Sequence, residues 1–324
     1  MTTPSTRQRG AALLLAMLVL TLVATLASAA QWQQWRAGEI EAADRQRAQA
    51  GWVLIGALDW ARLILIEDAR GNQRGNADHL GEPWAMPLEE ARLSSFLAAD
   101  RSARSDDTLQ AFLSGEISDQ QARLNFLNLV RVSGSGAAAK VTISALDLQA
   151  FTRLYEQLDL PQTELDAAVA ELQRSTQRGL QDLVPGPDAL APGKLAHLSW
   201  LGISATSLAA LQAHVTLLPE PTRLNLNTAS ATALMASAPG LEQAQAQRLI
   251  QARAREPFLS VADANRLLGT QPPPFSDPLH GTRSQYFEVR GRLRLDDTVI
   301  EERSLVRRDG LQVRVLWRER LAGS

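Results

Sequence analysis

The side chains that could carry out chemistry are scattered along this sequence. The histidines lie far apart, and no HExxH, GxSxG, phosphate-loop or Rossmann glycine pattern is present; they are His79, His197, His214 and His280. The absence of cysteine excludes thiol catalysis, thiolate metal sites and disulfides. The sequence therefore predicts a protein that is not an enzyme.

A candidate nucleic-acid-binding site is the segment 224–258, LNLNTASATALMASAPGLEQAQAQRLIQARAREPF. It resembles the helix-hairpin-helix units that bind DNA phosphates through backbone N–H groups at a helix start. Gly240 fits that pattern, but Glu242 stands where a second glycine is expected, and its carboxylate would repel phosphate. We interpret the segment as a hairpin for packing or partner contact and expect no nucleic-acid partner. A membrane-anchored protein for DNA binding or uptake stays the alternative function.

Three acidic residues are candidates for a hard cation such as calcium, which needs clustered oxygen ligands. Asp277 stands in a proline-rich loop, and Asp296 and Asp297 stand in a predicted turn. No EF-hand spacing is present, and paired acids in a turn are ordinarily solvated. These residues are thus candidates and not a ligand set.

The N-terminus indicates the class of protein. Residues 1–10 carry Arg7 and Arg9 and no acid, and residues 11–30 contain no charge. Twenty helical residues are about the length needed to cross a ~30 Å hydrocarbon core. The basic flank is expected to stay in the cytoplasm, which sends the rest of the chain to the outer face of the membrane.

Three interpretations of this segment differ in where the chain is cut. Residues 27–29 (Ala-Ser-Ala) would suit removal of a signal peptide, and an uncleaved anchor is the second possibility. The third is cleavage between Gly10 and Ala11, which leaves the apolar helix as the new N-terminus. We favour the third because residues 31–69 continue the helix without a proline, whereas a mature domain rarely opens by continuing its own signal helix.

This arrangement resembles the type IV pilin class, which includes the pseudopilins of type II secretion. Most members carry glutamate at the fifth residue after the cleaved glycine, but that position here is Leu15. The absence of this glutamate is characteristic of the GspK family, the largest minor pseudopilin. The strings DHLGEPWA (78–85) and GEISDQQARLNFLNL (115–129) are also similar to that family.

The resemblance implies a non-enzymatic subunit at the tip of the pseudopilus. A tip subunit has no further neighbour whose N-terminal amine could pair with a membrane-embedded glutamate, so leucine at this position costs less free energy. The resemblance implies processing by a prepilin peptidase, a single-pass inner-membrane anchor and a periplasmic C-terminal domain. The implied partners are other minor pseudopilins in a hetero-oligomer, together with secreted proteins or the outer-membrane channel. It also implies calcium binding in the αβ domain.

The expected fold is α+β, a pilin-like domain with an antiparallel sheet and an inserted all-α domain containing a helix-hairpin-helix or SAM-like unit. The expected parts are leader 1–10, transmembrane and spine helix 11–70, first αβ part 71–140, helical insertion 141–272 and C-terminal strands 273–324. The apolar segment 51–69 is expected to be packed along most of its girth, with Gly51 and Gly56 as places for a bend. Alternation predicts a β-hairpin over 106–131, a linker at 134–136 and strands in 286–317 around a turn at Asp309-Gly310.

Overall fold

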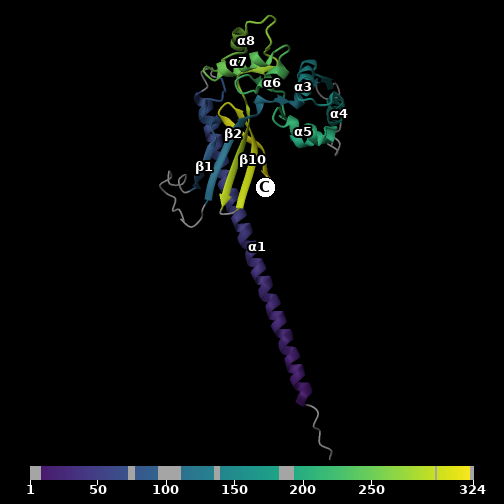
Figure 1. Ribbon diagram of the computed structural model, residues 1–324, viewed down its shortest axis with the longest axis vertical. Helices are drawn as coiled ribbons and strands as arrows, with labels where there is room; N and C mark the ends of the chain where they lie inside the picture. The colour runs from purple at the N-terminus through teal and green to yellow at the C-terminus, as the bar shows by residue number, and fades with distance from the viewer. Residues whose placement is uncertain are drawn as a thin grey trace, which may run out of the picture. The chain divides into compact units, whose positions relative to one another are not determined.

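The computed structural model describes residues 9–71, 77–93, 111–134, 139–181, 193–295 and 298–321 (Figure 1). The chain divides into two compact units, Met1–Gly56 and Ala57–Ser324. Each is described by itself.

The first unit belongs to a single long helix, α1 (Arg9–Gly71), which has 63 residues and continues without a break at Gly51 or Gly56. Its apolar N-terminal part is long and apolar enough to cross a membrane, with a mean hydropathy of 2.4 in its most apolar window. The hydroxyls of Thr21, Thr25 and Ser28 donate to backbone carbonyls three or four residues earlier, so these polar groups are satisfied within the helix.

The second unit contains a five-stranded antiparallel sheet in the order β1-β2-β9-β10-β11. The strands are β1 (Leu88–Arg92), β2 (Ala111–Asp119), β9 (Tyr286–Leu295), β10 (Thr298–Asp309) and β11 (Gln312–Leu321). One face packs on α1 of this unit and on the short helix η2 (Pro83–Ala85), in a core of Leu58, Ala61, Leu65, Trp84, Phe287, Val289, Val306 and Val313. The predicted α+β fold with an antiparallel sheet is confirmed.

The C-terminal strands follow the predicted alternation. Phe287 and Val289 are buried, and β10 and β11 are joined at Gly310, whose φ of +55° lies in the left-handed region that favours glycine. On the opposite face Arg290 lies 3.2 Å from Glu116 and 3.4 Å from Glu301. Cross-strand pairs of opposite charge therefore account for the arginine-rich face.

The predicted hairpin over 106–131 is wrong. β2 pairs with β1 and β9, and the chain then turns through η3 (Gln120–Ala122) and η4 (Phe126–Leu129). The intervening β3 (Leu124–Asn125) pairs in parallel with β6 (Val215–Thr216). Alternation indicates a half-buried strand but does not identify its partner, and the carboxylate of Asp119 accepts from the Gln121 N–H and starts the turn.

Of the predicted linker at 134–136, only Gly134 is among the described residues, and it lies between two paired strands and not between two domains. β4 (Val130–Ser133) pairs with β5 (Lys140–Ile143), so Gly134, with φ of +80°, begins the connection between two paired strands.

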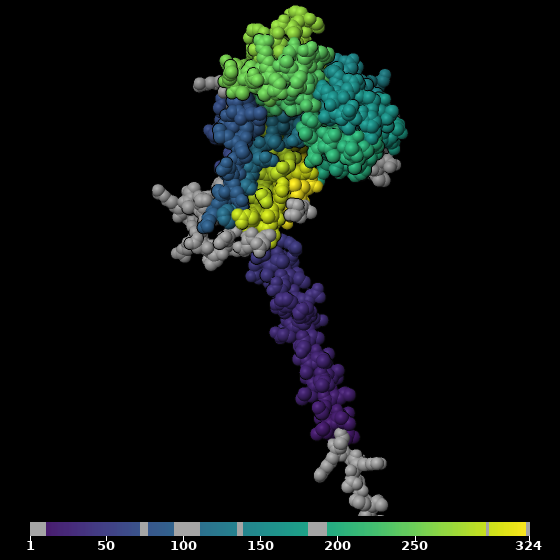
Figure 2. All heavy atoms as spheres, in the orientation of Figure 1, coloured from purple at the N-terminus to yellow at the C-terminus, as the bar shows by residue number. Residues whose placement is uncertain are grey.

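The inserted helices form a separate lobe of this unit, coloured teal to green in Figure 2. They are α3 (Ala145–Gln157), α4 (Gln162–Gln181), η7 (Leu195–Leu201), α5 (Ala205–Leu211), α6 (Ala231–Ser237), α7 (Gln243–Arg253) and α8 (Val261–Leu268). A capping box formed by Ser260 and Asp263 starts α8, whereas at the start of α3 the Ser144 hydroxyl bonds the Asp147 carboxylate at 2.5 Å instead of capping the backbone. The hydrophobic core of this lobe includes residues from Leu124 to Phe275.

The expectation that the spine would be packed along most of its girth is wrong. Leu58, Ala61 and Leu65 are buried, but the side chains of Trp60 and Leu63 are 47% and 61% exposed. The sheet covers only one side of a helix, so the other side keeps its apolar residues in solvent.

Candidate functional site

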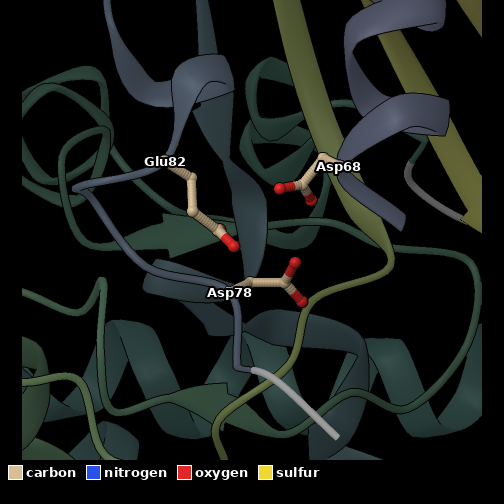
Figure 3. Close-up of side chains that lie close together, drawn as sticks. All are labelled: Asp68, Asp78 and Glu82. Atoms are coloured by element: carbon tan, nitrogen blue, oxygen red, sulfur yellow. The ribbon is translucent and has the colours of Figure 1, made fainter. Parts of the chain in front are cut away.

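Three carboxylates converge where the spine helix ends. Asp68 lies near the end of α1, and Asp78 and Glu82 lie in the segment that precedes η2. One oxygen of each lies within 4.8 Å of the others, and Figure 3 shows the three side chains pointing toward one another. By ligand type alone such a group could hold a hard cation.

The guanidinium of Arg308 already occupies this group. Its Nη1 donates to Asp68 Oδ2 at 2.6 Å, and its Nη2 donates to Asp78 Oδ1 and, at 2.9 Å, to the Ser284 carbonyl. Glu82 Oε2 accepts from Trp84 Nε1 at 2.7 Å and from the His79 N–H at 2.9 Å. A metal ion would have to displace these donors, so we assign the group as an ion-pair network.

A fourth carboxylate, Asp119 at the end of β2, connects this network to the helical insertion. Its Oδ2 accepts from the hydroxyls of Thr228 and Ser284, both at 2.6 Å, and from Asn225 Nδ2 at 3.1 Å. Asn225 Nδ2 also donates to the Asp78 carbonyl at 3.1 Å. Asp68, Asp78, Glu82, Asp119 and Arg308 are called the carboxylate network below.

Burial controls the protonation of the network. Burial raises the pKa of Asp119 to about 6, against the opposing effect of its hydrogen bonds from Ser284, Thr228 and Gln121. Burial and the charge of Glu82 raise the pKa of Asp68 to about 7, although Arg308 opposes this. Burial lowers the pKa of Arg308, but Asp78 and Asp68 outweigh this and the net shift is upward.

The residues singled out from the sequence lie elsewhere. Leu15 is 66% exposed on α1, and that helix begins at Arg9, so Gly10 and Ala11 are in its first turn. Asp277 is exposed in the stretch between α8 and β8 (His280–Gly281). Arg7, Asp296 and Asp297 lie outside the described residues.

The carboxylate network was not predicted from the sequence, although two of its members lie in the family-like string DHLGEPWA. This string contains Asp78 and Glu82 beside Trp84, and acidic residues among apolar and turn-forming residues could have indicated buried carboxylates. Their partner Arg308 is 230 residues from Asp78, which no local pattern indicates.

One arginine of the hairpin segment, Arg253, is used internally, whereas Arg248 and Arg255 are exposed. α6 and α7 flank Gly240, whose φ is +71°. Arg253 is buried and donates to the Leu226 carbonyl at 2.6 Å, and burial lowers its pKa to about 10. Arg253 is therefore poorly placed to contact phosphate, and Arg266, which lies beyond the segment on α8, pairs with Asp263 on its own helix.

Comparison with known proteins identifies the family. A family model described as type II secretion system (T2SS), protein K, matches residues 224–283. The type II secretion system protein K of Klebsiella pneumoniae is 31% identical over 276 residues, covering 79% of this chain and 78% of that protein. This chain belongs to the type II secretion system protein K family.

Other members of the protein K family match over a similar extent. The Pseudomonas aeruginosa protein is 27% identical over 90% of this chain and 86% of its own length. The fold is similar to that of a chain in the crystal structure of the GspK-GspI-GspJ complex from enterotoxigenic Escherichia coli, with a TM-score of 0.59 and 16% identity, covering 87% of this chain and 99% of that one.

This protein K family member is a minor pseudopilin of type II secretion. Its long apolar helix fits a single-pass inner-membrane anchor. The DNA-binding alternative is not supported.

Proposed function

We propose that this chain is the tip subunit of the type II secretion pseudopilus, made by removal of residues 1–10 and assembled with other minor pseudopilins in the periplasm. The observation that carries the proposal is the exposed apolar side of α1 at Trp60 and Leu63, which continues a helix that begins in an apolar segment. A structurally similar chain was crystallised in a GspK-GspI-GspJ complex, which supports sister subunits as the partners.

Three further parts of the proposal rest on the sequence. Leu15 suits a tip position because a carboxylate there would have no amine to pair with. The basic flank with Arg7 and Arg9 favours an orientation with the C-terminal domain in the periplasm. Calcium, with Asp277 and the pair at 296–297 as candidates, stays part of the proposal, as do contacts with secreted proteins or the outer-membrane channel. The role is structural, not catalytic.

Processing gives the first prediction. In cells that contain a prepilin peptidase, the membrane-bound chain is expected to start at Ala11, and a mass higher by one methyl group would indicate N-methylation. Without the peptidase it is expected to start at Met1. Intact mass and N-terminal sequencing measure both. A start at Ala30 in either strain would contradict the proposal and indicate signal-peptide removal.

Assembly gives the second prediction. Replacing Trp60 and Leu63 together by alanine should weaken binding to co-expressed minor pseudopilins, because the two side chains lie three residues apart on one side of α1. Removing two apolar anchors from an interface costs about 2 kcal/mol or more, roughly thirtyfold in affinity. Co-purification and titration in detergent measure the loss.

The matched control is Trp200→Ala, since Trp200 is 61% exposed on η7, which belongs to the helical insertion. Binding should be unchanged in this variant. Equal weakening by both changes would contradict an interface along the spine.

A further inference from the structure

The sheet and the helical insertion meet at one buried carboxylate. Asp119 comes from the last residue of β2, whereas Asn225 and Thr228 belong to β7 (Leu224–Asn225) and the turn that follows it. Ser284 comes from the segment that returns to β9, and its N–H donates to Asp78 Oδ2 at 2.7 Å. The bonds to Asp119 therefore join both a turn in the middle of the insertion and the segment that follows the insertion to the sheet.

The surroundings of Asp119 suit both of its protonation states. As a carboxylate it accepts four donors, the Gln121 and Asn225 N–H groups and the hydroxyls of Thr228 and Ser284. A hydroxyl can rotate from donor to acceptor, so either one can accept the proton of a neutral Asp119 without movement of heavy atoms. Opening of the contact would expose the carboxyl to water, where the charged form is favoured.

Charged groups lie on every side of this contact. Asp78, Glu82 and His79 lie on the segment before η2, Asp68 on α1, Arg308 on β10, and His280 on the strand paired with β7. Arg223 and Arg123 are near the same turns, and Arg283 precedes Ser284. Burial lowers the pKa of His280 to about 4, so its effect opposes that of Asp119 in acid and must be cancelled by comparing variants.

We propose that the contact between the helical insertion and the sheet is proton-linked through Asp119, so that the insertion is held more tightly as the pH falls from about 7.5 to about 4.5. The sign follows from linkage. The pKa of Asp119 is about 6 when buried against 3.8 as the ordinary value, so the closed form binds the proton more strongly. Opening therefore releases a proton, and acid disfavours it.

The test is hydrogen exchange of the full chain in detergent, read at the amides of Gln121, Ser284 and Gln285, each of which donates to a side chain of this contact. Exchange is corrected for its intrinsic pH dependence. Asp119→Asn keeps the shape and removes the proton site. Between about pH 7.5 and 4.5, the ratio of the opening constants of the native chain and this variant should fall about 25-fold.

The control is Asp166→Asn, an exposed residue on α4, for which the ratio should not change with pH. A constant ratio for Asp119→Asn would overturn the proposal. If that variant does not fold, Thr228→Val decides the matter, because loss of a hydroxyl donor should make protection of the same amides depend more steeply on pH. Equal pH dependence in Thr228→Val and the native chain would also overturn it.

Discussion

Replacing Arg308 by methionine should destabilise the second unit by about 3–5 kcal/mol, because it leaves buried carboxylates without their cation. Arg308 is only 9% exposed, and Asp68 and Asp78 are 5% and 3% exposed in their side chains. The guanidinium also lies 4.8 Å from the ring centroid of Phe287, so its removal loses packing as well as charge. For a domain of this size the melting temperature in detergent should fall by about 10 °C.

The pH dependence of this loss distinguishes charge from packing. Without Arg308 the folded-state pKa of Asp68, already about 7, must rise further, so the destabilisation should be greatest above pH 7 and should shrink as the pH falls to about 6. Arg308→Lys keeps the charge but not the two-pronged geometry, and should lie between the native chain and methionine. Arg266→Met, at an exposed pair on α8, should cost less than about 1 kcal/mol. A loss independent of pH would mean that packing alone explains the effect.

Replacing Trp84 by alanine should cost about 3–5 kcal/mol, since it opens a cavity in the core between α1 and the sheet. Trp84 is 1% exposed and packs edge to face on Phe287, with ring centroids 5.1 Å apart. Its Nε1 is also a donor to Glu82, so alanine removes a hydrogen bond from a buried carboxylate. Thermal unfolding in detergent measures the loss.

Two variants separate these causes. Trp84→Phe keeps most of the buried ring and removes the N–H, so it should cost about 1–3 kcal/mol. Trp200→Ala, at an exposed tryptophan, should change stability by less than about 1 kcal/mol. A full loss with phenylalanine would show that the hydrogen bond to Glu82 dominates, whereas an unchanged melting temperature with alanine would contradict the packing of this segment.

The sequence predicted elements whose pattern is local. An uncharged stretch followed by a helical segment without proline predicts α1. Period-two alternation on both sides of the turn at Asp309-Gly310 predicts strands in the C-terminal part of the chain. The partner of β2 was mispredicted because alternation indicates only which face is buried. β2 pairs with β9, which is far along the chain, instead of with the segment that follows it.

The carboxylate network could not be predicted for the same reason. Asp68 and Arg308 are 240 residues apart, and Asp119 is 106 residues from Asn225 and 165 from Ser284. The exposure of Leu63 was missed because an apolar segment does not reveal whether its own domain or another chain will cover it.

The place where the insertion leaves the sheet has a consequence for how such a protein can change. Asp119 of β2 pairs directly with Phe287 of β9, so everything between them starts and finishes at neighbouring points. The entropy of closing a loop grows only with the logarithm of its length, about 0.6 kcal/mol for each doubling. The helical lobe can thus be enlarged, shortened or replaced over evolutionary time while the register of the sheet stays the same. The surface of the lobe can therefore adapt to different partners.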